Sequence, residues 1–162
     1  MNQQQFFPPP RRYWLGVVSR SHVACGIAGG FAQVCHGKAG PLQRMALGDG
    51  FVYYSPKTDL TDGEPLQQFT AIGQVSGNAA YPFAMAPDFT PYRRDIRWFP
   101  AQAAPIQPLL PRLSFVTDLR HWGYALRAGH LELTAEDFSL IATAMQAEMR
   151  EVSHGICESV QR

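Results

Sequence analysis

Histidine and cysteine side chains that could bind a metal are concentrated in one short stretch, at His22, Cys25, Cys35 and His36. Structural zinc sites usually pair ligands two to four residues apart on both arms, whereas Cys35 and His36 are adjacent. The spacing therefore argues against zinc, and we expect neither a metal nor another cofactor. Small buried thiols and loop histidines explain these residues better.

Nucleophilic catalysis is a second possibility, in which His22 or His36 would activate one of four side chains, Ser19, Ser55, Cys25 or Cys35. No GxSxG or related signature accompanies them, and the glycines of residues 26–37 fit neither a Walker loop nor the GxGxxG dinucleotide pattern. A hydroxyl near a histidine is more often a turn or loop hydrogen bond. We therefore expect no catalytic residues.

Arginines among aromatic residues form the third pattern that could carry chemistry. Of the 14 basic residues 12 are arginine, and Arg93, Arg94 and Arg97 share one expected strand with Tyr92 and Trp98. Arginine binds phosphate in a bidentate manner and stacks on planar bases, so this strand fits a nucleic-acid surface. A strand face in contact with solvent is the alternative, and aromatic residues are more often simple core.

Strands and short helices must position these groups. Apolar runs and alternation predict strands over residues 13–18, 51–55, 66–75 and 92–99. Helices are expected over 21–27 and from Pro41, and Thr134 is expected to cap a third helix that carries one apolar stripe. In the strand over 92–99, alternation turns Arg94 inward. A bend or bulge is expected at Gly73.

Length and composition fit one domain. The chain has 162 residues, a formal net charge of +1 and 46% hydrophobic residues, which suffices to bury a core without disulfides. The near-neutral charge excludes a histone-like binder but not local basic patches. An odd number of cysteines without a CxxC pair, and no run of ~20 apolar residues, predict a cytoplasmic protein without a membrane span.

Several short strands with few helices predict an α+β fold, a small twisted barrel. Residues 1–12, which contain three consecutive prolines, are expected to form a flexible arm. We expect one domain over residues 13–152 and a tail over 153–162.

Short motifs follow one another in a characteristic order. They are Trp14–Ser19, His22, Gly29–Gln33, His36–Lys38, Pro41–Leu42, Gly48–Asp49, Tyr53–Pro56, Phe69–Gly73, Tyr92–Arg94, Ala104–Ile106 and Trp122–Gly123. Together they resemble the EVE domain family, a PUA-like relative of the YTH readers of methylated adenine, over about residues 13–150.

The resemblance implies a PUA-like α+β fold, in which a strongly curved mixed β-sheet closes into a small barrel with flanking helices. It also implies a non-catalytic module that binds DNA or RNA and reads a modified base in an aromatic-lined pocket. Methylated or hydroxymethylated cytosine and methyladenine are the bases considered. A nucleoside or metabolite sensor, or an enzyme using the same pocket, is the alternative, and a partner enzyme encoded separately is compatible with either function.

The resemblance also assigns residues. The base-binding set is Ser19, Phe31, Gln33, Tyr54, Ser55 and Trp122. The phosphate-binding set is His36, Lys38, Arg93, Arg94 and Arg97. Phe31 and Tyr54 are expected to form two aromatic walls, with Gln33 pairing with the base edge. The alternatives are a helix cap for Ser19 and core positions for Phe31 and Trp122.

Overall fold

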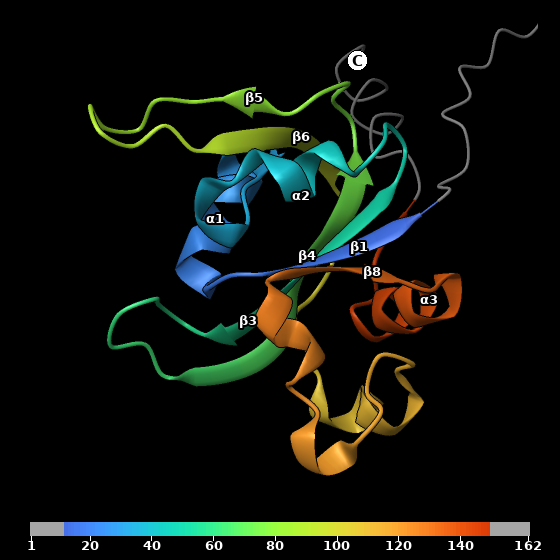
Figure 1. Ribbon diagram of the computed structural model, residues 1–162. Coiled ribbons are helices and arrows are strands. Elements are labelled where there is room, and N and C mark those ends of the chain that lie inside the picture. The colour runs from blue at the N-terminus through green and yellow to red at the C-terminus, as the bar shows by residue number, and fades with distance from the viewer. Residues whose placement is uncertain (1–11, 150–162) are drawn as a thin grey trace, which may run out of the picture.

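A computed structural model describes residues 12–149 and shows a curved mixed sheet with few helices (Figure 1). The strands are β1 (Tyr13–Val17), β2 (Phe31–Ala32), β3 (Gly50–Lys57), β4 (Pro65–Val75), β5 (Tyr81–Pro82), β6 (Tyr92–Trp98), β7 (Ala104–Pro105) and β8 (His130–Leu133). The strand order is β2-β6-β4-β3-β1-β8, with β5 paired to β6 and β7 paired to β4. Because β1 is parallel to β3 and antiparallel to β8, the sheet is mixed. The predicted curved α+β fold is confirmed.

Three α-helices and four 3-10 turns complete the described residues. They are α1 (Arg20–Gly29), η1 (Cys35–Gly37), α2 (Ala39–Gln43), η2 (Gln107–Arg112), η3 (Leu119–His121), η4 (Ala125–Ala128) and α3 (Ala135–Ala144). The predicted cap of α3 is confirmed, because the Thr134 hydroxyl accepts a hydrogen bond from the Asp137 N–H at 3.0 Å. No helix within residues 12–149 is long and apolar enough to cross a membrane. Residues 1–11 of the expected arm and the whole expected tail lie outside the described part.

Strand alternation divides the core into two clusters on opposite faces of the sheet. On β3, Val52 and Tyr54 pack into the cluster that α3 and η2 cover, while Phe51 and Tyr53 pack into the other. Figure 1 shows α1 and α2 on one side of β1, β3 and β4, and α3 on the other. Both faces of the central strands are buried, which explains their nearly continuous apolar sequences.

A bulge in β4 changes which residues face each cluster. Tyr53 pairs with Ala71, whereas Tyr54 pairs with Phe69, so Thr70 is the additional residue. The expected irregularity therefore lies three residues before Gly73. Gly73 instead allows β4 and β6 to approach closely, because a Cβ there would lie 2.4 Å from the Arg97 carbonyl oxygen of the adjacent strand β6.

Candidate functional site

Three strands at one end of the sheet form a small outer ribbon, in the order β2, β6, β5. Phe31 pairs with Asp95 and Ala32 with Arg94, so Gln33, which follows β2, lies beside Arg93. On the other edge of β6, Tyr81 pairs with Arg93. Side chains two residues apart on a strand share a face, so the ribbon presents its polar and aromatic groups on one side.

The Arg93 guanidinium lies between two phenylalanine rings. Its Cζ atom is 3.8 Å from the centroid of the Phe31 ring and 3.8 Å from the centroid of the Phe83 ring. Two rings cannot occupy the same face of one guanidinium at this distance, so each ring covers one face. We call the space between them the Phe31–Phe83 slot. It is as wide as one flat group needs, because carbon atoms pack best at about 3.5 to 4.0 Å.

Gln33 forms the polar edge of the slot and is 6% exposed. Its side-chain Oε1 accepts a hydrogen bond from Arg93 Nε at 3.1 Å. Since arginine carries only donors, the amide oxygen must face Arg93 and the Nε2 group must point elsewhere. Gln33 Nε2 has no hydrogen-bond partner among the residues that the structure describes.

Tyr53 and His22 hold the Gln33 backbone through hydrogen bonds. The Tyr53 hydroxyl accepts from the Gln33 N–H at 2.8 Å and donates to its carbonyl at 3.0 Å. His22 Nε2 lies 3.0 Å from the same carbonyl oxygen, which only accepts, so Nε2 carries the proton. Burial lowers the pKa of His22, and the nearby positive charge of Arg93 lowers it further. The neutral imidazole therefore serves as a fixed support for the slot.

His22 and the cysteines do not converge on a metal site. Within residues 12–149 no group of three or more His, Cys, Asp or Glu side chains is arranged to hold an ion. Cys25 is exposed on α1, and the Cys35 thiol donates to the Ala128 carbonyl at 3.6 Å. Burial raises the pKa of the Cys35 thiol, so its thiolate form is disfavoured.

A tight turn beside the ribbon carries two exposed polar side chains, His36 and Lys38. Cys35, His36 and Gly37 have φ angles of 52°, 58° and 84°, a left-handed conformation that is costly for the first two residues. A Cβ at Gly37 would lie 2.4 Å from the Pro91 Cβ, so the turn packs directly against the chain entering β6. His36 and Lys38 are thereby exposed next to the ribbon.

Arg94 occupies a different environment from the phosphate contact expected for it. It is 3% exposed, and its guanidinium donates to the carbonyls of Leu42 and Met45 at 2.8 Å each and to that of Gly77 at 3.0 Å. Burial lowers its pKa, and Asp49 partly offsets that effect. We therefore assign Arg94 to the structure of the domain and leave it out of the binding surface.

Four other expected site residues also lie away from the slot. Tyr54 is 2% exposed and packs against Phe69 in the cluster on the α3 side. Ser55 is fully buried and shares a hydrogen bond of 2.8 Å with Thr70. Trp122 is half-buried against the α3-side cluster. Ser19 caps α1, because its hydroxyl accepts from the His22 N–H at 3.4 Å.

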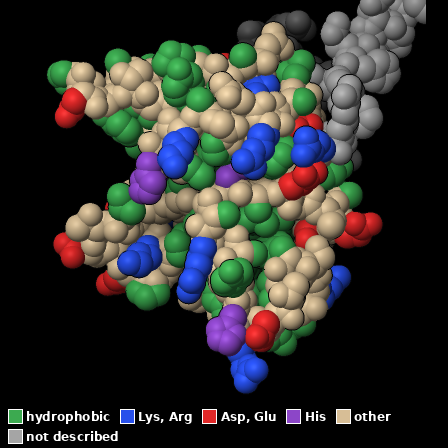
Figure 2. All heavy atoms as spheres, viewed as in Figure 1, with side chains coloured by type: hydrophobic (Ala, Val, Ile, Leu, Met, Phe, Trp, Pro, Cys, Tyr) green, Lys and Arg blue, Asp and Glu red, His purple; other side chains and the backbone are tan. Residues whose placement is uncertain are grey.

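Arg97 is half-buried and donates to Gln74 Oε1 at 2.9 Å. Of the expected phosphate-binding residues, Arg93 lies in the slot, and His36 and Lys38 are exposed on the turn that packs against Pro91, just before β6. Figure 2 shows Lys and Arg side chains spread across one face of the molecule, with acidic side chains mainly toward its edges.

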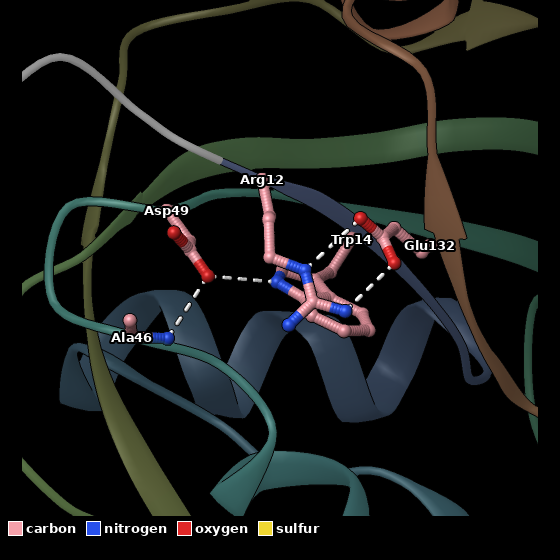
Figure 3. A network of polar contacts seen from close by, with 5 residues as sticks. All are labelled: Arg12, Trp14, Ala46, Asp49 and Glu132. Carbon is pink, nitrogen blue, oxygen red and sulfur yellow. Dashed lines mark hydrogen bonds and ion pairs between the residues drawn. The ribbon is translucent and has the colours of Figure 1, made fainter.

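A separate polar network fixes the loop that leads into β3 (Figure 3). Asp49 Oδ2 accepts from Trp14 Nε1 and from the Ala46 N–H, both at 2.9 Å. Arg12 lies over the Trp14 ring and pairs with Glu132 at 2.8 Å. This network supports the loop after α2 from which Met45 offers its carbonyl to Arg94.

The sequence analysis did not single out Phe83. Phe83 follows the two-residue strand β5, which is too short to show any periodicity. Phe83 lies two residues after Tyr81, which pairs with Arg93, so an extended chain places Phe83 on the same face as Arg93. Alternation predicts that Tyr53 faces packing, and Tyr53 is fully buried in the cluster with Phe51. From that position its hydroxyl also holds the Gln33 backbone.

Comparisons with known proteins agree on the family of this fold. A model of the EVE domain matches residues 12–144. A UPF0310 protein encoded in the gntR 5′ region of Bacillus licheniformis is 50% identical over 127 residues, 78% of this chain and 86% of that protein. The UPF0310 protein msl3206 of Mesorhizobium japonicum is 52% identical over 137 residues, 83% of this chain and 92% of that protein.

Solved structures show the same fold at low sequence identity. The YTH domain of the Zygosaccharomyces rouxii MRB1 protein, determined in complex with N6-methyladenosine RNA, superposes with a TM-score of 0.58 at 13% identity and covers 94% of this chain and 95% of that one. A Pseudomonas syringae protein superposes with a TM-score of 0.54 at 20% identity and covers 81% of this chain and 97% of that one.

Proposed function

The chain belongs to the EVE domain family, and from this premise we propose that it is a non-catalytic module that reads a modified base of DNA or RNA in the Phe31–Phe83 slot. The observation that carries the proposal is the guanidinium held flat between two aromatic rings. A nucleobase is also planar, and base stacking on aromatic side chains contributes about 1 to 3 kcal/mol per base.

Gln33 gives the slot a polar edge with which a base can pair. Its backbone is held by the Tyr53 hydroxyl, which places the side-chain amide at the slot before a ligand arrives. A methyl mark contributes only about 1 kcal/mol of apolar burial. Selectivity for the mark therefore requires a close fit plus the penalty for an unpaired buried edge, which the buried Gln33 amide supplies.

The surroundings of the slot suit a nucleic-acid strand better than a free nucleobase. His36 and Lys38 are exposed on the adjacent turn and would meet the phosphates. The shared fold with a YTH domain determined in complex with N6-methyladenosine RNA supports a nucleic-acid partner. Within residues 12–149 we assign no catalytic nucleophile and no general base to the slot, so we propose binding without chemistry.

The test is a titration of short single- and double-stranded DNA and RNA bearing 5-methylcytosine, 5-hydroxymethylcytosine or N6-methyladenine, each against its unmodified counterpart. Preference for one mark supports the proposal. Phe83→Ala should weaken binding of the preferred modified strand by about tenfold or more and leave the unmodified strand nearly unchanged.

Phe89→Ala is the matched control, because Phe89 is an exposed phenylalanine in the same β5–β6 connection, at 41% exposure against 46% for Phe83. Its removal should leave the preference for the mark intact. Equal losses on modified and unmodified strands in Phe83→Ala would contradict the assignment of the slot. A preference for free nucleosides over every strand would favour a metabolite sensor instead.

A further inference from the structure

Arg93 occupies the space that the proposed function requires for a base. Its guanidinium uses both ring faces of the slot and the side-chain oxygen of Gln33. A base that stacks between the same rings and pairs with the same amide cannot be present at the same time. Entry of a base therefore requires Arg93 to leave.

Within the described part of the chain, the Arg93 guanidinium contacts only neutral groups in this position, the Phe31 and Phe83 rings and the Gln33 amide oxygen. Among residues 12–149 no carboxylate forms an ion pair with it. Asp95, on the same face of β6, instead accepts a hydrogen bond of 2.7 Å from the Tyr81 hydroxyl. Aromatic faces and an amide oxygen carry no opposite charge, whereas a phosphate offers both a negative charge and two oxygens that match the guanidinium as a bidentate pair.

On these contacts we infer that Arg93 closes the empty slot and exchanges its aromatic partners for the phosphate of an entering nucleotide, so that the site selects a base carried by a phosphate over a free nucleoside. The inference rests on the proposed function, and it names the substrate class as a nucleotide unit of a strand. A nucleoside must displace Arg93 without offering it a new partner. A nucleotide supplies that partner beside Lys38 and His36.

Displacement also changes what the slot offers to a base edge. While Arg93 is in place, Gln33 Oε1 accepts its Nε–H. Once Arg93 has moved to a phosphate, the same oxygen is free to accept from an exocyclic amine, while Nε2 donates to a ring acceptor. Recognition of the amino edge of adenine or cytosine is thereby coupled to recognition of the strand backbone.

The binding experiment compares 5-methyl-2′-deoxycytidine and N6-methyladenosine with their 5′-monophosphates, on the wild-type protein and on Arg93→Ala. In the wild type, the monophosphate of the preferred base should bind at least tenfold more tightly than the nucleoside. In Arg93→Ala the nucleoside should bind several-fold more tightly than it binds the wild type, and the advantage of the phosphate should largely disappear.

Arg127→Ala is the matched control, because Arg127 also lies over an aromatic ring, at 5.6 Å from the Tyr124 centroid, but on η4 outside the ribbon. It should leave both affinities unchanged. Weaker nucleoside binding in Arg93→Ala would overturn the inference, since Arg93 would then be a wall of the site. Equal wild-type affinity for nucleoside and monophosphate would overturn it as well.

A measurement without ligand separates this inference from the proposed function. In the free protein, the Arg93 Nε–H resonance should be shifted upfield by the two rings, and Phe83→Ala should move it toward the value of an exposed arginine. An unshifted Arg93 resonance would refute closure of the slot even if a modified base is read. A shifted resonance together with no preference for any modified base would refute the reader function and leave the closed slot standing.

Discussion

His130 is a buried polar residue whose ring nitrogens form no hydrogen bonds within residues 12–149. It is 6% exposed, and its ring stacks on Trp14 with centroids 5.0 Å apart. Burial lowers its pKa to about 4, with a smaller contribution from the positive charge of Arg44. The imidazole is therefore buried in its neutral form, at the cost of two unmade hydrogen bonds.

This burial predicts a loss of stability in acid. The unfolded chain binds a proton at His130 below about pH 6.5, whereas the folded chain does not until about pH 4. The free energy of unfolding should therefore fall as the pH drops from about 6.5 to 4, by up to about 3 kcal/mol from this residue. Urea unfolding across this range measures it.

His130→Phe keeps a ring on Trp14 and removes the titrating nitrogens. This variant should lose less stability than the wild type between about pH 6.5 and 4. His121→Ala is the control, because His121 is exposed and pairs with Asp118 on η3. Parallel pH profiles for His130→Phe and the wild type would show that other groups account for the acid sensitivity.

At the scale of elements, Arg94 ties β6 to the end of α2 and to the connection after β4. From β6 it reaches the carbonyls at the end of α2, at Leu42 and Met45, and the carbonyl of Gly77 in the connection after β4. Its neighbour Arg93 points to the opposite face of the same strand, into the slot. Alternation on β6 thus gives two consecutive arginines unrelated roles.

Arg94→Met should destabilise the fold, because it leaves buried carbonyls without a donor. We expect a decrease of about 3 kcal/mol in the free energy of unfolding, measured by urea titration. Arg112→Met, at an exposed position of η2, should change it by less than about 0.5 kcal/mol. Unchanged stability of Arg94→Met combined with weaker binding to all strands would assign Arg94 to phosphate contact after all.

At the scale of the whole molecule, charge limits how the domain can hold nucleic acid. The net charge is +1, and two of the arginines expected to contact phosphate, Arg94 and Arg97, donate hydrogen bonds to oxygen atoms of the protein itself. His36, Lys38 and the displaced Arg93 remain beside the slot. A small number of phosphate contacts is therefore expected, with affinity dominated by the base in the slot.

The salt dependence of binding measures this number. For about three contacts on a single strand, a plot of log K against log salt should have a slope of about −2. Fluorescence anisotropy of a labelled modified oligonucleotide between about 50 and 300 mM NaCl gives the slope. Lys38→Gln should make it shallower by about 0.7. A slope near zero would exclude phosphate contacts, and one steeper than about −5 would indicate a non-specific cationic binder.

The sequence predicted the longer elements because each carries enough residues to show a period. The strands β1, β3, β4 and β6, the three helices and the Thr134 cap could all be placed, and alternation correctly turned Arg94 inward. Two-residue strands contain no period, so β2 and β5 could not be predicted, although both border the slot. Alternation correctly turned Tyr53 into packing. It separates the two faces of a strand without indicating which face meets a site, so it could not show that Tyr54 is also buried in the core.

What the sequence determined by itself is the α+β class, the family and the presence of Phe31, Gln33 and Arg93 in a candidate site, since local patterns and motif order encode these. Only the tertiary structure decided which of these residues contact one another. Phe31 and Phe83 are separated by more than fifty residues of chain, and only the antiparallel pairing of β2 and β5 on either edge of β6 brings their rings to opposite faces of Arg93. Contacts of this kind depend on strand register, which non-local pairing sets.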